Sequence, residues 1–278
     1  MGVLEGIDYG TAGLLAGIAL LEGLRRVPAG ALVLRRPMWD GWRVADEPAT
    51  ESRTTMVSWW APFTVSVLVP PVKDGAPHPD PGELASRWTT ARRFTPALAV
   101  LGGLTLASLV LGIPFAIAKA GVSGFLAGLI VTAAASVATG AVCGAALRAL
   151  GASRGTAWRR GLACLSPFAA PRAIEVVHEA ALASATPLAA TRVALSPVQF
   201  RAWIRPAVWD HLAGDPALAE LGRLIPPSEM AALVADPGSG AEDGGSTFCP
   251  RCGSAWRLSD GSCPACPDGI TLRPLRGR

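Results

Sequence analysis

Charged residues are scarce in this 278-residue chain. They make up 17% of the sequence, half of the residues are apolar, and lysine occurs only at Lys73 and Lys119. Soluble domains of this size usually carry about a quarter charged residues. The formal net charge is only +4, which gives no support to a nucleic-acid-binding protein. The long stretches without any charge argue against an ordinary soluble domain.

Histidine is also rare, and none of the three histidines has the neighbours that a catalytic site needs. The sequence HEAAL, starting at His178, begins like the zinc-protease signature HExxH but has Leu182 in place of the second histidine. A catalytic zinc normally needs three protein ligands, so we expect His178, beside Val177, to be buried or interfacial. His78 and His211 have no ligand-like neighbours. We also find no nucleophile motif, phosphate-binding loop or dinucleotide fingerprint. The sequence thus predicts no catalytic residue and no cofactor-binding residue, and favours a protein that is not an enzyme.

Two adjacent stretches, residues 95–118 and 121–147, contain no charged residue at all. Each is long enough to cross about 30 Å of hydrocarbon, and neither has the polar stripe of a helix in a soluble protein. Only Lys119 and Ala120 separate them, so the connection must reverse the chain. We expect a transmembrane helical hairpin over residues 95–149; a hairpin buried in a soluble core is the alternative.

Two features within the hairpin bear on its packing. Gly124 and Gly128, like Gly140 and Gly144, are spaced so that helix backbones can approach closely in lipid. This spacing is compatible with a homo-oligomer formed through small-residue helix faces. Pro114 is expected to kink its helix, because proline lacks the backbone N–H of a regular turn.

The N-terminal region, residues 1–26, contains a shorter apolar stretch at residues 9–24. Glu5 and Asp8 precede it, and Arg25 and Arg26 follow. A cleaved signal peptide has its positive charges before the apolar run, so we expect an uncleaved helix with its N-terminus outside. The alternative is an amphipathic helix lying on the membrane surface.

Arginines flank the hairpin on both sides, whereas its turn carries only Lys119. The positive-inside rule therefore places the turn outside and the C-terminus in the cytoplasm, as in a multi-pass protein of the cell inner membrane that has the lipid bilayer as a partner. The flanking residues are Arg87, Arg92 and Arg93 before the hairpin, and Arg148, Arg154, Arg159 and Arg160 after it.

Residues 27–94 are predicted to form a small cytoplasmic β-rich module of three to five strands, followed by a Pro-rich linker at residues 73–83. The short β-type runs are 31–34, 42–44, 55–59 and 63–69, and the last alternates as a half-buried strand does. We expect the tryptophans of this module to fill its core or anchor it at the bilayer interface. A surface for lipid head groups or a ligand is the alternative. These residues are Trp39, Trp42, Trp59 and Trp60.

Residues 150–236 are predicted to form a cytoplasmic helical region. After Pro171, an apolar face includes Ile174, Val177, Ala181 and Leu182. Ser196 and Pro197 mark another helix start, and Pro206 is expected to break or kink that helix. Residues 237–247 are rich in Gly and Ser and predict a flexible linker.

The tail, residues 248–278, contains two Cys-x-x-Cys pairs, formed by Cys249, Cys252, Cys263 and Cys266. Zinc prefers four ligands in a tetrahedron, and thiolates supply them well. Cysteines in a disulfide scaffold would be spread through a small secreted fold. About thirty residues cannot bury enough core to fold alone, so a metal would have to supply the stability. The pattern therefore predicts a structural Zn²⁺ site.

The sequence CPRCG followed by CPAC resembles the short zinc-ribbon family found at the termini of many bacterial membrane and regulatory proteins. The resemblance covers only the tail, and it implies that Cys249, Cys252, Cys263 and Cys266 are the ligands. Pro267 departs from the pattern, because the second knuckle often has Gly at this position. Four thiolates leave no open coordination position for catalysis.

Together these features predict a mainly α integral membrane protein. It would have two or three transmembrane helices, a small cytoplasmic β module, a short-helix region and a C-terminal zinc ribbon. The leading hypothesis is a membrane-tethered interaction or regulatory protein that binds a cytoplasmic protein partner. The alternative is a transporter or membrane enzyme with a site among the helices or in the Trp-rich module. Nucleic-acid binding by the mildly basic tail is disfavoured, because Asp260 and Asp268 dilute its charge.

Overall fold

The computed structural model divides the chain into two compact units, Met1–Ala194 and Leu195–Arg278. The boundary falls inside the predicted helical region 150–236, so the helices before residue 195 belong with the hairpin. The described residues are 9–22, 24–37, 40–46, 53–56, 64–71, 79–210, 221–222, 224–225, 247–249, 255–256, 261 and 272–274.

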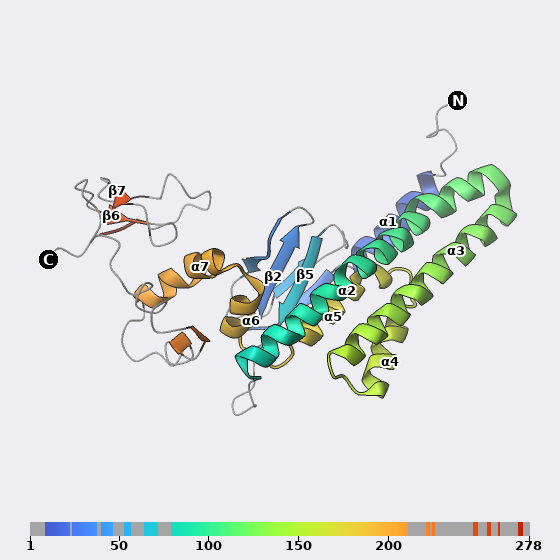
Figure 1. The fold of residues 1–278 in the computed structure, drawn as a ribbon. Helices are drawn as coiled ribbons and strands as arrows, with labels where there is room; N and C mark the ends of the chain where they lie inside the picture. The colour runs from blue at the N-terminus through green and yellow to red at the C-terminus, as the bar shows by residue number, and fades with distance from the viewer. Residues whose placement is uncertain are drawn as a thin grey trace. The chain divides into compact units, whose positions relative to one another are not determined.

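A long helical hairpin dominates the first unit (Figure 1). It comprises α2 (Pro81–Ala107), the π-helical turn η2 (Ser108–Gly112) and α3 (Ile113–Ala149). The chain reverses at Gly121, whose φ of 56° lies in the left-handed region, where glycine carries no Cβ penalty. The predicted antiparallel helical hairpin is confirmed. Its continuous helical stretch, residues 81–149, is the one among the described residues that is long and apolar enough to cross a membrane.

The two arms of the hairpin touch through small and hydroxyl-bearing side chains. A Cβ added to Gly124 would lie 1.9 Å from the carbonyl oxygen of Ala116 on the opposite arm. Farther from the turn, the hydroxyls of Ser108 and Thr132 are hydrogen-bonded at 2.7 Å. These contacts set an antiparallel register in which residue numbers on facing positions sum to about 240.

Helix α2 begins well before the apolar stretch, at a capped start. The side chain of Asp80 accepts hydrogen bonds from the backbone N–H groups of Gly82 and Glu83, at 2.9 and 3.4 Å, and Pro81 occupies the first turn. Both features are typical helix starts. The prediction that residues 73–83 form a linker is therefore wrong at its end, because the last three of these residues belong to α2.

The expected disturbance at Pro114 takes the form of the π-helical turn η2. Proline has no N–H to donate to the carbonyl of Val110, four residues earlier. Just before it, the N–H of Ile113 donates to the carbonyl of Ser108, five residues back. A five-residue hydrogen bond defines a π turn, which inserts irregularity without ending the helix.

Large apolar side chains cover the outer surface of the hairpin. Only 28% of its most apolar window is buried, which distinguishes it from the core helix of a soluble protein. The exposed residues are Val100, Leu104, Leu111, Phe115, Val122, Phe125, Leu126, Leu129, Ile130, Val131 and Val137.

The described residues of the first unit form five strands. β1 (Leu24–Val27) pairs with β4 (Arg53–Met56), and a second sheet has the order β3-β2-β5. Its strands are β2 (Leu32–Pro37), β3 (Arg43–Asp46) and β5 (Thr64–Val69), all antiparallel. Val65, Val67 and Val69 of β5 are buried, as the alternation predicted. Strand β1 was not expected from the sequence.

Short helices surround the hairpin. α1 (Tyr9–Glu22) lies against η2 and α3, and α4 (Arg154–Ala163) packs along α3. The 3-10 turn η3 (Ala170–Arg172) and α5 (Ala173–Ala181) lie against α2, and α6 (Pro187–Ala194) contacts α2 and β2.

The second unit begins with α7 (Pro197–Asp210), which starts where the sequence predicted and buries Phe200 and Ile204. The helix is not broken at Pro206. A three-stranded antiparallel sheet of order β7-β6-β8 follows. It is formed by β6 (Thr247–Phe248), β7 (Ala255–Trp256) and β8 (Arg273–Pro274).

Gly140 tests the packing of α4 on α3. A Cβ at this position would lie 2.7 Å from the carbonyl oxygen of Gly161, so Gly140→Ala should force the two backbones apart and destabilise the fold by about 1–3 kcal/mol. Gly17→Ala is the matched control, because nothing lies within 4 Å of its added Cβ. Thermal unfolding in detergent should show a lower midpoint for Gly140→Ala only. Equal midpoints would contradict the close packing.

Candidate functional site

Helix α5 covers the open edge of strand β5. In the order β3-β2-β5, strand β5 has a strand neighbour on one side only, so every second backbone N–H points away from the sheet. α5 packs against this edge and, on its other side, against α2. Glu175, His178 and Glu179 of α5, together with Arg172 and Arg25, form a polar cluster, which we call the α5 cluster.

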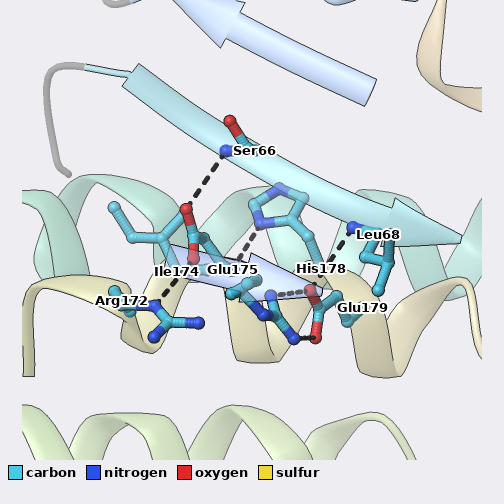
Figure 2. Close-up of polar contacts among 8 residues, drawn as sticks. Ser66, Leu68, Arg172, Ile174, Glu175, His178 and Glu179 are labelled. Carbon is cyan, nitrogen blue, oxygen red and sulfur yellow. Dashed lines mark hydrogen bonds and ion pairs between the residues drawn. The ribbon is translucent and has the colours of Figure 1, made fainter. Parts of the chain in front are cut away.

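Two carboxylates of α5 accept the unpaired amides of β5 (Figure 2). Glu175 Oε1 accepts from the Ser66 N–H and Glu179 Oε1 from the Leu68 N–H, both at 3.3 Å. Four residues of α-helix rise about 6.0 Å, and two residues of a strand span about 6.6 Å. The spacing of the two glutamates therefore matches the spacing of the two amides.

Each carboxylate is also bound by an arginine. Arg172 Nε donates to Glu175 Oε2 at 3.2 Å. The two terminal nitrogens of Arg25, in β1, donate to the two oxygens of Glu179 at 2.5 and 3.3 Å. A two-pronged pair of this kind fixes orientation as well as charge. The α5 cluster thus ties β1, β5 and α5 together.

His178, between the two glutamates, lies in an aromatic cage. It is fully buried, as expected from the sequence. Its ring centroid lies 5.3 Å from that of Trp42 and 4.8 Å from that of Trp88 of α2. Trp42 is likewise buried, which confirms the core role expected for it; Trp39, Trp59 and Trp60 lie outside the described residues.

Burial shifts the titration of two groups in opposite directions. Loss of solvent raises the pKa of Glu175 to about 6, although Arg172 and the Ser66 amide oppose the shift. Loss of solvent also lowers the pKa of His178 to about 4. Its Nδ1 lies 2.9 Å from the carbonyl oxygen of Ile174, so this nitrogen carries the proton of the neutral ring. Its Nε2 is buried with no hydrogen-bond partner.

The α5 cluster is suited to hold elements together rather than to carry out chemistry. Glu175 and His178 are sealed from solvent. A cavity of about 430 Å³ opens beside Glu179, between Leu68, Arg160 and Ser184. However, both oxygens of Glu179 are already engaged by Arg25. The glutamates were not singled out from the sequence, because the strand amides that they accept lie more than a hundred residues away.

The predicted zinc ligands are only partly described. Cys249 is buried and directly follows β6, whereas Cys252, Cys263 and Cys266 lie outside the described residues. Within the part of the chain that is described, no group of three His, Cys, Asp or Glu residues could hold a metal ion. The structure therefore does not test the four-cysteine site.

Two further cysteines lie close together in the first unit. Cys143 of α3 and Cys164, at the end of α4, are both buried. Their thiols interact with each other, although 21 positions separate them in the sequence. This contact adds to the packing of α4 on α3. No family model matches the chain, and neither a curated protein nor a solved structure shows significant similarity to it.

The opposite shifts of Glu175 and His178 predict a compensated pH response. Because the pKa of Glu175 is raised, the folded protein binds this proton more tightly than the unfolded chain does. The folded state therefore loses stability as the pH rises from 4.5 to about 6. Because the pKa of His178 is lowered, the unfolded chain binds this proton more tightly than the folded protein does. The folded state therefore loses stability as the pH falls from 6.5 to about 4. The two effects oppose each other between pH 4.5 and 6.

Single variants should expose each effect. His178→Leu should become more stable on acidification from pH 6.5 to 4.5, by about 2 kcal/mol, and Glu175→Gln less stable, by about 2–3 kcal/mol. The free energy of unfolding in detergent, measured across this pH range, tests both. Glu83→Gln, at an exposed position of α2, controls for the change in charge. Variant curves that run parallel to the wild-type curve would refute the opposing shifts.

Proposed function

We propose that the chain is a membrane-anchored interaction protein. In this proposal the hairpin lies in the lipid bilayer, and the β/α module and the C-terminal zinc ribbon face the cytoplasm, where the ribbon binds a protein partner. One observation carries the proposal: many large apolar side chains of the helical hairpin are exposed, whereas its buried positions include glycines and hydroxyl-bearing residues alongside Leu98, Leu109, Ile113 and Leu147.

Exposed large apolar side chains together with buried glycines and hydroxyls are unusual in water-soluble helix pairs. Helices in water bury Leu, Ile and Phe because burial removes apolar surface from water. In lipid that driving force is absent, and small or hydrogen-bonding residues form the contacts instead. The buried positions of the hairpin include Gly102, Thr105, Gly124, Thr132, Ser136, Thr139 and Gly140, and hydroxyls of this set bond to helix carbonyls within their own arms.

Helix α1 supports the proposal as a third apolar helix. It lies against η2 and α3, and between Gly10 and Leu21 its only polar side chain is Thr11. Such a helix has no polar face with which to lie on a membrane surface. Its 14 residues extend about 21 Å, so it is shorter than a full span.

The zinc-ribbon proposal draws support from the strand order of the tail. The first Cys-x-x-Cys pair falls in the connection between β6 and β7, and the second between β7 and β8. The Leu272 N–H donates to the Gly261 carbonyl at 2.8 Å, which closes a loop around the second pair. We propose Cys249, Cys252, Cys263 and Cys266 as ligands of a structural Zn²⁺.

An interaction role is favoured over transport because the proposed spans contain no ionisable side chain other than that of a cysteine. Asp, Glu, Lys, Arg and His are absent from residues 95–118 and 120–147, whereas intramembrane ionisable groups usually mark transport or proton pathways. The arginines on both flanks support a topology with the turn at Lys119 outside and the C-terminus inside.

Replacing an exposed apolar residue by arginine tests lipid contact. Ile130 on α3 and Val198 on α7 are both 68% exposed, so in water both substitutions should be nearly neutral. If lipid surrounds α3, Ile130→Arg should cost about 2–3 kcal/mol of insertion free energy and reduce the membrane-bound fraction, while Val198→Arg should not. Cell fractionation with quantitative blotting measures this. An Ile130→Arg chain that fractionates like Val198→Arg would exclude membrane insertion of the hairpin.

Paired cysteine variants test the ribbon and its partner. Elemental analysis of the purified full chain should give one zinc per chain, and Cys249→Ser/Cys252→Ser should abolish it. The same variant should stay in the membrane but lose the proteins captured by cross-linking to the wild-type chain. Cys143→Ser/Cys164→Ser is the control for lost thiols and should retain zinc. A wild-type chain without zinc, or unchanged capture by the zinc-free variant, would contradict the ribbon's proposed role.

A further inference from the structure

A groove of about 1110 Å³ runs between α3 and α4. It exists because both helices present small side chains at their contact, where Gly140 and Gly161 bring the backbones together. Around this contact, Ala141, Ala145 and Gly155 line the groove without filling it. Two helices with larger side chains at these positions would leave no such space.

One end of the groove is apolar. Val137 on α3 and Leu162 and Leu165 on the other side line this end, and all three are exposed. From Val137 to Arg148, α3 extends about 16 Å, which is comparable to a lipid acyl chain. Trp158 also lines the groove and is 69% exposed, and tryptophan is enriched where membrane proteins meet the head-group region.

The end of the groove near Arg148 of α3 is positively charged. Arg148 and Arg154 line it, and Arg148 Nη1 donates to the Ala152 carbonyl at 2.8 Å, which holds its side chain in place. The sequence has no Asp or Glu between Glu83 and Glu175, so no carboxylate along this stretch competes for these arginines. An apolar channel that ends at two arginines complements a molecule with an acyl chain and an anionic head group.

We propose that this groove binds one anionic phospholipid. Its phosphate is held by Arg148 and Arg154 through charge-assisted hydrogen bonds, and one acyl chain lies along α3 toward Val137. This inference rests on the membrane insertion proposed above. It adds a defined lipid site to what would otherwise be general contact with the bilayer.

Lipid binding by the purified full chain in detergent tests the site, because a micelle of neutral detergent lacks the surface potential of a bilayer. Phosphatidylglycerol and phosphatidylcholine with identical acyl chains are added separately, and bound lipid is counted by native mass spectrometry. The wild-type chain should retain one phosphatidylglycerol in preference to phosphatidylcholine. Arg148→Gln/Arg154→Gln should lose at least about tenfold of this preference. Arg93→Gln/Arg159→Gln, with equal charge loss at exposed positions outside the groove, should keep it.

A second variant tests the acyl channel without changing charge. Ala141→Phe should fill the channel and reduce retention of both lipids, whereas Ala134→Phe, on α3 but outside the groove lining, should not. Equal losses in both arginine variants, or full retention in Ala141→Phe, would overturn the proposed site. If those results accompany a chain that still fractionates with membranes, the anchoring proposal stands. A chain recovered as a soluble monomer without detergent would overturn both.

Discussion

The first unit depends on the match between a helix and the edge of a sheet. Strand β5 leaves backbone amides at Ser66 and Leu68 without strand partners, and buried unpaired amides each cost about 1–3 kcal/mol. Glu175 and Glu179 satisfy both. Because the same helix lies against α2, this capping also attaches the β module to the base of the hairpin. A sheet with a free edge would instead invite pairing with other chains.

The cost of this arrangement is the burial of charge. A carboxylate at the Glu175 position loses its hydration, and Arg172 restores only part of what is lost, which is why the pKa of Glu175 stays raised. His178 meets the same loss of solvent by staying neutral between two tryptophans. The two neighbours on one helix thus bias protonation in opposite directions.

The kinds of side chain that α2 buries change along its length. Near its start it buries Leu84 and Trp88, as a helix in a water-soluble domain does, and beyond residue 95 it buries Leu98, Gly102 and Thr105. Over the same stretch the large side chains of Val100 and Leu104 are exposed. This change along one helix supports the proposal that lipid surrounds the hairpin.

Local patterns were enough to predict the hairpin, strand β5 and the apolar face of α5, because each depends on periodicity within a short window. The start of α2 at Asp80 was not predicted although its cap is visible in the sequence, because the nearby Pro and Gly residues are also typical of a linker. Strand β1 was missed because Arg25 and Arg26 look like a charged flank. The strand partners of Glu175 and Glu179 are 109 to 154 residues away, and no local pattern in one sequence encodes such a pairing.

The spacing of the glycine pairs in the hairpin predicts close helix packing but does not identify the helix that packs there. Small residues four apart predict that another backbone comes close, and the sequence allowed that backbone to belong to a second copy. In the structure Gly124 faces Ala116 of the same hairpin, and Gly140 faces Gly161 of α4. These faces are occupied within the chain, so a homo-oligomer, which stays a prediction, would have to form through the large apolar surface outside them. The close approach at Gly140 also leaves the flanking alanines facing empty volume, so the residues that let α4 pack on α3 are the ones that create the groove.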